Sequence, residues 1–267
     1  MVEFAKRLAY SRRQFRPDKG YAMIRPLVAL IFLCCFTSTA LAGDWRVIPI
    51  RLFLGPQIKN DSVRLINNAS EPLNLQLNAT VWSQNVQGED IYEETSDIIF
   101  FPRVLSIPPG EERLLRVGYK FPAVAAEKTY RLFIEEIPNA TPDQVSQVMV
   151  AVRFGLPIFV APPKTEKTAT IDMVTLAQGE VTARVVNNGN THVLPSKVAV
   201  SGKNTSGETL FSHDMRAWYI LTGNQRSFTA TIPPDECKKA SSLYFEFASG
   251  SLQLTDEKPL LKSDCQP

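Results

Sequence analysis

The side chains that could carry catalysis or bind a metal are few in this chain of 267 residues. The two histidines, His192 and His213, lie in separate segments, and the chain contains neither an HExxH nor a CxxC motif. A structural zinc needs further ligands at close spacing, so the sequence predicts no metal site. The glycines are scattered and form no phosphate-binding loop, so we expect no cofactor.

The segment Ser212-His213-Asp214 contains the residue types of a serine hydrolase. Such a triad is defined by its geometry in space, and the GxSxG motif that exposes a nucleophilic serine is absent. An exported hydrolase on a β scaffold would therefore lack an identifiable active site. We therefore predict that the protein is not an enzyme.

The start of the chain has the pattern of a secretory signal. Met23 and Arg25 precede an uninterrupted apolar run at residues 27–36, and residues 40–42 (Ala-Leu-Ala) fit a signal-peptidase site. The run is too short to cross a bilayer, which takes about 20 apolar residues. We therefore expect a signal region at 1–42, with translation from Met23, cleavage after Ala42, export, and no stable insertion in a membrane.

Removal of the signal region changes the charge balance. The chain has 29 basic and 27 acidic residues, of which seven and two lie in residues 1–42, so 22 basic and 25 acidic residues remain, a net charge of −3. This near-neutral balance gives no electrostatic basis for binding nucleic acid or an anionic membrane. No nucleic-acid partner is therefore expected.

Two of the four cysteines, Cys34 and Cys35, belong to the predicted signal, which leaves Cys237 and Cys265. In an oxidising compartment, the simplest outcome for two cysteines is one disulfide. The bond would close a loop of about 28 residues and contribute roughly 3 kcal/mol in the chain-entropy account. We expect this disulfide in the exported protein.

The residues after the signal have the pattern of β-strands throughout. Short runs rich in Val, Ile, Leu and Thr recur between Pro, Gly and Asn, and no segment keeps a helical apolar period. About seven such runs precede residue 160, which is typical of an immunoglobulin-like sandwich, although the Cys-Trp-Cys core of antibody domains is missing. The first expected strand, residues 47–54, would place its even-numbered side chains on one face.

The mature length is sufficient for two domains. Adjacent prolines interrupt strand pairing and stiffen the chain, so we place a linker at residues 161–166. It separates an N-terminal domain, 43–160, from a C-terminal domain, 167–267. Residues 183–188 (Ala-Arg-Val-Val-Asn-Asn) echo residues 63–68 (Val-Arg-Leu-Ile-Asn-Asn), which agrees with a second all-β sandwich.

One expected strand, residues 148–156, alternates without interruption. Its apolar residues fall on one face, because successive strand side chains point to opposite sides. They are Val148, Val150, Val152, Phe154 and Leu156. A strand inside a sandwich shows the same alternation, so the pattern indicates either a core strand or a strand that lends its apolar side chains to a partner.

Three segments of the first domain resemble successive motifs of periplasmic pilus chaperones of the chaperone-usher pathway. They are residues 106–117, with the turn Pro108-Pro109-Gly110; residues 129–138, Thr-Tyr-Arg-Leu-Phe-Ile-Glu-Glu-Ile-Pro; and the alternating strand that ends in Ile158-Phe159-Val160. The resemblance implies two immunoglobulin-like sandwiches, a periplasmic location and no enzymatic activity. It also implies that residues 148–156 complete a pilin subunit by donor-strand complementation, and that the subunit then passes to an outer-membrane usher.

The same resemblance implies a pair of basic residues that hold the C-terminal carboxylate of the subunit. Arg51 matches the basic residue of the first strand, but Pro157 stands where the family has a lysine near the end of the donor strand. This departure suggests the archaic branch of these chaperones. We expect Arg131 to replace the lysine, since a guanidinium stays charged and pairs with a carboxylate through two hydrogen bonds. Arg116 and Arg153 are weaker alternatives.

The sequence leaves a second class of protein open. An exported, two-domain immunoglobulin-like structural or adhesive protein would have the same strands, but residues 148–156 would pair only within their own domain. A chaperone should leave part of that strand exposed, whereas a structural sandwich should bury it. The identity of the pilin subunit and the oligomeric state do not follow from the sequence.

Overall fold

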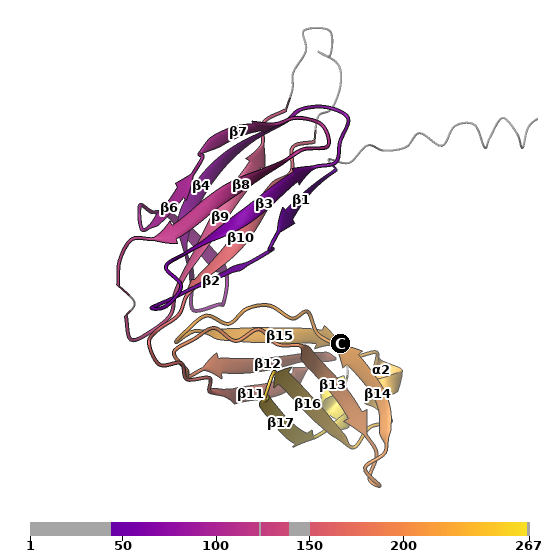
Figure 1. Ribbon diagram of the computed structural model, residues 1–267. Helices are drawn as coiled ribbons and strands as arrows, with labels where there is room; N and C mark the ends of the chain where they lie inside the picture. Colours follow the sequence, from indigo (N-terminus) through magenta and orange to yellow (C-terminus); the bar gives the residue numbers. More distant parts are fainter. Residues whose placement is uncertain (1–43, 123, 139–149, 266–267) are drawn as a thin grey trace, which may run out of the picture. The chain divides into compact units, whose positions relative to one another are not determined.

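The computed structural model describes residues 44–122, 124–138 and 150–265, and these are almost entirely β-strands (Figure 1). The helices within these ranges are the short α2 (Pro234–Cys237) and the 3-10 turn η2 (Lys262–Cys265). No helix in the same ranges is long and apolar enough to span a membrane. The architecture confirms the predicted all-β fold of two immunoglobulin-like sandwiches.

Ten described strands form the first sandwich. They are β1 (Trp45–Ile48), β2 (Leu52–Leu54), β3 (Asn60–Asn67), β4 (Leu73–Gln84), β5 (Asp90–Glu94), β6 (Ile98–Phe101), β7 (Val104–Ile107), β8 (Glu112–Tyr119), β9 (Lys128–Glu136) and β10 (Arg153–Val160). One sheet has the order β1-β3-β8-β6, and the other has the order β2-β10-β9-β4-β5, with β7 also paired to β4 (Figure 1). Alternate apolar side chains of both sheets, such as Leu65, Leu75 and Leu132, form the core between them.

The first predicted strand, residues 47–54, is wrong as a single element. β1 lies in one sheet and β2 in the other, with Pro49 between them, because a proline has no N–H group with which to continue a ladder. The break also changes the buried face: Ile50 is exposed, whereas Leu52 and Leu54 lie in the core. One apolar run of the sequence therefore contributes an exposed residue, Ile50, and two core residues, Leu52 and Leu54.

Seven described strands form the second sandwich. They are β11 (Ala169–Ala177), β12 (Glu180–Asn187), β13 (Lys197–Lys203), β14 (Thr209–Asp214), β15 (Gln225–Thr231), β16 (Ser242–Ser249) and β17 (Leu252–Pro259). They form two sheets with the orders β11-β12-β15 and β14-β13-β16-β17, around a separate core that includes Val185, Phe245 and Phe247. Among the described strands, no ladder joins one sandwich to the other.

A buried asparagine occupies the same place in both sandwiches. Asn67 ends β3 and Asn187 ends β12, each at the same position of the two echoing segments. Each side-chain amide donates to backbone carbonyls across a turn, and each Oδ1 accepts the N–H group two residues further on. Buried polar groups are found almost always bonded in this way, so the echo marks a shared structural turn.

Cys237 and Cys265 form a disulfide that ties α2 to η2, and both residues are fully buried. The double variant Cys237→Ala/Cys265→Ala should lose about 3 kcal/mol of unfolding free energy, because the cross-link restricts the unfolded chain over a separation of 28 residues. Denaturant unfolding measures this loss. Peptide mapping under non-reducing conditions should recover the two cysteines in one linked peptide, and two free thiols in the exported protein would contradict the pairing.

Side chains of both sandwiches meet in a small aromatic cluster. It contains Trp82 and Phe159 from the first sandwich and Tyr219 and Leu221 from the second, all of them buried. The side chain of Gln84 joins the two: its Nε2 donates to Tyr219 O (3.0 Å), and its Oε1 accepts from Leu221 N (2.9 Å). These bonds hold this part of the second sandwich against the outer face of the sheet that contains β10.

Candidate functional site

The strand predicted at residues 148–156 corresponds to β10, which starts and ends later in the chain. Val148 lies outside the described residues. Val150 precedes the strand and is 82% exposed, whereas Leu156 is fully buried in the core of its own sandwich. The apolar face therefore runs from solvent at its N-terminal end into the core at its C-terminal end.

One edge of β10 is open. β10 pairs with β9 along its whole length, but with β2 only over Ile158–Val160, so among the described residues nothing pairs with the other edge at Arg153–Pro157. Val152 O accepts a hydrogen bond from the β9 backbone (3.0 Å), so the alternation of an antiparallel ladder turns the backbone groups of Arg153 and Gly155 toward the open edge, where Gly155 O already accepts one bond from a side chain. Such groups are a template for another strand.

An apolar hollow of about 150 Å³ lies beside this edge, between β1 and the start of β10. Its lining consists of Trp45, Val47, Ile50, Val152 and Phe154. Phe154 packs partly against the core, and Val152 is half-buried. An apolar side chain of a partner strand at the open edge could therefore enter between the two sheets.

Arg131 of β9 crosses the outer face of β10. Its Nη1 donates to Gly155 O (2.9 Å), and its guanidinium carbon lies 4.0 Å from the ring centre of Trp82 and 5.8 Å from that of Trp218. The residue is only 7% exposed. Two aromatic faces and one carbonyl thus hold the cation, and no carboxylate of the described residues forms an ion pair with it.

Two nitrogens of this guanidinium, Nε and Nη2, are buried without a hydrogen-bond partner among the described residues. They lie on the same side of the planar group, so their N–H bonds form a fork that matches both oxygens of one carboxylate. A buried donor without a partner costs about 1–3 kcal/mol, which a bound carboxylate would remove. Burial raises the pKa of the neighbouring Tyr92 phenol against the opposing charge of Arg131, so this phenol stays neutral and does not balance that charge.

Arg51 and Arg131 flank Pro157 in the sheet. Arg131 is the direct cross-strand neighbour of Pro157 on β9, and Ile158 pairs with Leu52 in the parallel ladder of β2, so Arg51 stands beside Pro157 on the other side. Arg51 forms no hydrogen bond or ion pair with any residue that the structure describes. Pro157 thus lies between Arg51 and Arg131, the two arginines that the sequence predicts as the anchor.

The two weaker candidates have other surroundings. Arg153 stacks over the ring of Phe133 at 3.9 Å and forms an exposed ion pair with Glu135 at 4.0 Å. Arg116 belongs to β8, in the sheet that does not contain β10. The structure therefore brings Arg51 and Arg131 together at the end of the open edge and leaves Arg116 apart from them.

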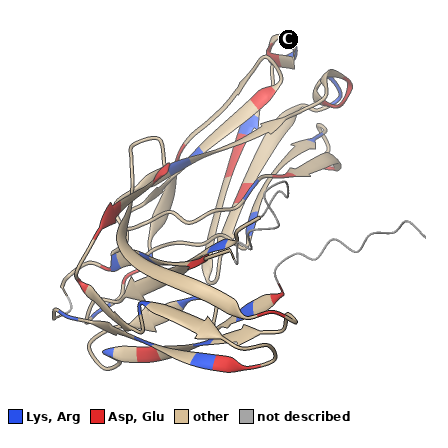
Figure 2. Cartoon of the chain, turned by 90° about the horizontal axis from the view of Figure 1, so that it is seen from above, with Lys and Arg blue, Asp and Glu red and all other residues tan. Residues whose placement is uncertain are grey.

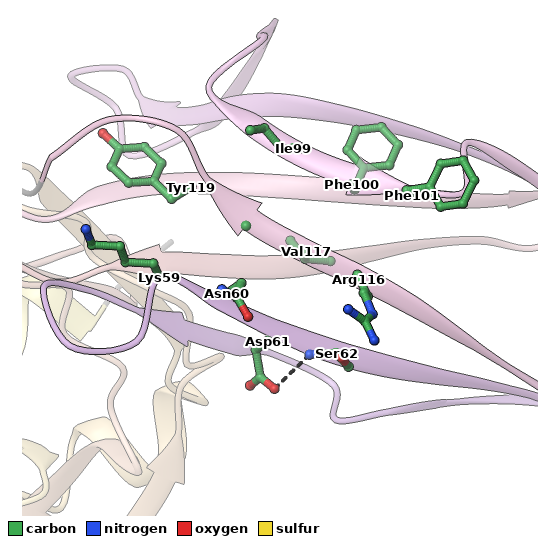
Figure 3. A pocket seen from close by; sticks show the side chains of 11 residues that line it. Lys59, Asn60, Asp61, Ser62, Ile99, Phe100, Phe101, Arg116, Val117 and Tyr119 are labelled. Atoms are coloured by element: carbon green, nitrogen blue, oxygen red, sulfur yellow. Dashed lines mark hydrogen bonds between the residues drawn. The ribbon is translucent and has the colours of Figure 1, made fainter.

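A second exposed surface surrounds Arg116 on the outer face of β3, β8 and β6 (Figure 3). A hollow of about 630 Å³ lies there, with Ile99 and Phe101 on β6 and with the cations Lys59 and Arg116 in its lining. Ile99, Phe101 and Leu114 are each more than half exposed. We call Ile99, Phe101, Leu114 and Arg116 the β8 patch.

Charged residues are otherwise interspersed over the strands, with basic and acidic side chains close to one another (Figure 2). Ion pairs such as Arg184 with Asp172 and Lys197 with Glu246 are partly exposed, and such pairs contribute little to stability. Arg131 differs from these cations because it is buried and has no ion-pair partner in the part of the chain that the structure describes.

Sequence reasoning missed the surroundings of Arg131. Trp82, Trp218 and Gly155 lie in separate segments, and only the fold brings them to one guanidinium. The sequence does indicate one of these neighbours. Trp82 lies three residues after the core residue Ala79 on the same strand, so its side chain points to the outer face of the sheet. A large aromatic side chain on an outer face indicates that something covers it.

Solved structures of pilus chaperones share this fold. A chain of the CsuC–CsuE chaperone–tip adhesion subunit pre-assembly complex, from the archaic chaperone-usher Csu pili of Acinetobacter baumannii, is 23% identical with a TM-score of 0.56, over 80% of this chain and 97% of that one. The CupB2 chaperone of Pseudomonas aeruginosa is 16% identical with a TM-score of 0.51, over 81% and 100%. A chain of the complex of SafA pilin with the SafB chaperone, from Salmonella enterica, is 9% identical with a TM-score of 0.53, over 84% and 99%.

The first sandwich also matches a family model. A comparison with curated proteins finds no match, but residues 46–166 match the pili and flagellar-assembly chaperone family, in its PapD N-terminal domain. This range contains β2 to β10, the open edge of β10, and both Arg51 and Arg131. The first sandwich therefore belongs to this family of pilus-assembly chaperones, and the chain as a whole shares its fold with solved pilus chaperones.

Proposed function

We propose that this protein is a periplasmic chaperone that captures incomplete pilin subunits by donor-strand complementation and delivers them to an outer-membrane usher. Its family consists of assembly chaperones and not of enzymes. The observation that carries the proposal is the open edge of β10, where the N–H groups of Arg153 and Gly155 turn outward beside an apolar hollow.

The open edge supports a specific mode of binding. A subunit strand would add to β10 through backbone hydrogen bonds, and Val150, Val152 and Phe154 would occupy the groove that the subunit's missing strand leaves. Pro157 has no N–H group, so the added ladder would end there. The subunit's C-terminal carboxylate would then lie beside Arg131 and Arg51.

Apolar burial can supply the binding energy without ATP. Burying one Val or Phe side chain contributes about 1.5–3 kcal/mol, and several such residues together exceed the cost of ordering a strand. The contacts would be released when the strand of a neighbouring subunit replaces the chaperone's strand. Among the similar structures, the CsuC–CsuE and SafA–SafB complexes each contain a chaperone with a subunit, and the former supports assignment to the archaic branch.

The organisation of the chain is part of the same proposal. The signal region, residues 1–42, lies outside the described residues, and its cleavage after Ala42 would release the protein into the periplasm. We assign the donor strand to an N-terminal domain at 43–160. The linker at 161–166 and the C-terminal domain at 167–267 complete the chain.

The alternative, an exported structural or adhesive protein, is less consistent with the observed strand. A structural sandwich has no reason to leave Val150 82% exposed beside a strand edge that no other described strand pairs with. Exposed apolar edges promote aggregation in proteins that do not use them.

Co-purification tests the proposal. Tagged protein is recovered from the periplasm of its own cells, and the proteins bound to it are identified by mass spectrometry. We expect a pilin-type subunit that lacks its last strand, in a one-to-one complex. Recovery of the chain alone, under conditions in which the cells make pili, would contradict the proposal.

For delivery, we propose that the usher binds the β8 patch. This patch lies on the sheet that does not contain β10, so it stays free when a subunit occupies the open edge. Its exposed apolar side chains and Arg116, which forms no ion pair with any described residue, suit an apolar segment with an acidic residue.

The variant Phe101→Glu should leave subunit capture unchanged and reduce surface pili at least about tenfold, because a buried, unpaired carboxylate in an interface costs more than 1.4 kcal/mol. Phe101 is 76% exposed, so the change should not affect folding. Electron microscopy counts the pili, and co-purification measures capture. The control is Val86→Glu, an equally exposed apolar residue outside the patch. Normal piliation with Phe101→Glu would exclude this surface.

A further inference from the structure

Arg131 is closed off from solvent, although the proposed anchor must receive a carboxylate from another protein. Its side chain is almost fully buried, yet the fork of Nε and Nη2 has no partner among the described residues. A carboxylate can therefore reach the fork only if a covering group moves. Four groups surround the guanidinium: the backbone of Gly155, the rings of Trp82 and Trp218, and the phenol of Tyr92.

Of these groups, Trp218 is the least restrained by the sheet, since Tyr92 lies on β5 directly opposite Trp82 and bonds to Asp90. Trp82 is 1% exposed and belongs to β4, which is paired on both sides, and Gly155 lies within β10. Trp218 is only half-buried and lies in the segment 215–219, which forms no strand. The indole can therefore swing away without breaking a ladder.

One side-chain hydrogen bond, together with packing against the edge of the aromatic cluster, holds the indole over Arg131. Trp218 Nε1 donates to Asp90 Oδ2 (2.9 Å). Asp90 also accepts from the Tyr92 hydroxyl (3.2 Å) and from Gln84 Nε2 (3.0 Å). Because these two bonds remain when the indole leaves, the aspartate stays in place and the closed position can form again.

The geometry points to Trp218 as a lid that covers Arg131 in the free chaperone and opens to admit the carboxylate of a subunit. This inference rests on the proposed function and adds control of access to it. A closed lid keeps small free carboxylates and other anions away from the fork. A subunit strand that already pairs with β10 presents its carboxylate at high local concentration and can capture the open form.

The lid lowers the apparent affinity for the subunit by the fraction of chaperone that is open. If about a tenth of the free protein is open, removal of the lid should raise the apparent affinity about tenfold. A Trp218 that instead forms part of the binding wall would have the opposite effect, since its removal would weaken binding.

Chemical modification of the guanidinium tests the lid without any subunit. The free protein is treated with phenylglyoxal, which reacts with accessible arginines, and the rate at Arg131 is followed by peptide mass mapping, with the exposed Arg116 as internal reference. Trp218→Ala should raise the rate at Arg131 about tenfold relative to Arg116. An unchanged rate in a folded variant would overturn the inference.

Two further variants keep the test decisive. Trp218→Phe retains an aromatic ring but loses the bond to Asp90, so it should give an intermediate rate even if the alanine variant is unstable. Arg216→Ala changes an exposed neighbour on the same segment and should match the wild type. The anchor and the lid can fail separately. If Arg131→Met still captures subunits while Trp218→Ala speeds the modification of Arg131, the anchor is wrong but Trp218 still covers Arg131. If Arg131→Met loses capture while Trp218→Ala leaves the modification rate unchanged, only the lid is wrong.

Discussion

Replacement of Arg131 by methionine is expected to lower the affinity for pilin subunits about a hundredfold to several thousandfold. Methionine keeps a long, flexible side chain between Trp82 and Trp218, but it has no N–H group for the carboxylate. Removing one partner of a buried charged pair costs roughly 3–5 kcal/mol, which gives that range of affinity. Titration calorimetry with a purified subunit, or co-purification from the periplasm, measures the loss.

Matched variants separate the anchor from a general effect of charge. Arg131→Lys keeps the charge but not the fork, so it should capture subunits less well than the wild type and better than Arg131→Met. Arg51→Met should also weaken capture, whereas Arg153→Met removes an exposed cation and should not. Normal capture by both Arg131→Met and Arg51→Met would show that neither residue is the anchor.

The variant Val150→Asp should abolish capture while the chaperone stays fully folded. Val150 is 82% exposed in the free protein, so an aspartate there meets only water. In the complex the same side chain would enter an apolar groove, where an unpaired carboxylate adds its desolvation cost to the lost apolar burial of about 1.5–3 kcal/mol. Thermal unfolding and subunit co-purification, measured on the same preparation, give both outcomes.

Neighbouring substitutions provide the comparison for Val150→Asp. Ala151→Asp adds the same charge to the next exposed residue, whose side chain points to the other face, and should retain capture. Leu156→Asp should instead unfold the first sandwich, because Leu156 is fully buried in its core. A folded Val150→Asp variant that still captures subunits would exclude residues 148–156 as the donor strand.

The all-β fold could be predicted because alternation of apolar side chains depends only on local sequence. The two sandwich cores follow from this alternation, whereas the similar turns at Asn67 and Asn187 correspond to the echo of residues 63–68 in residues 183–188. Alternation failed at residues 47–54, where the apolar pattern continues past Pro49 although the chain changes sheets there. The strands that pair with the chain before and after Pro49 are distant in sequence, so the local apolar pattern does not indicate them.

The site was predictable only in part for the same reason. The sequence indicates Arg131 because a guanidinium suits a carboxylate, and in the structure its side chain lies on the outer face of the sheet. Its burial under Trp218 depends on how the second sandwich contacts the first, which no motif near Arg131 indicates. The open edge of β10 likewise depends on where β2 stops pairing.

Hydrogen exchange at single amides of β10, with and without a bound subunit, tests the donor-strand account most directly. The Arg153 and Gly155 amides face the open edge, so they should exchange rapidly in the free chaperone and at least about a hundredfold more slowly in the complex. The Phe154 and Leu156 amides face β9 and should be protected in both states. Equally rapid exchange of Arg153 and Gly155 in a saturated complex would contradict the account.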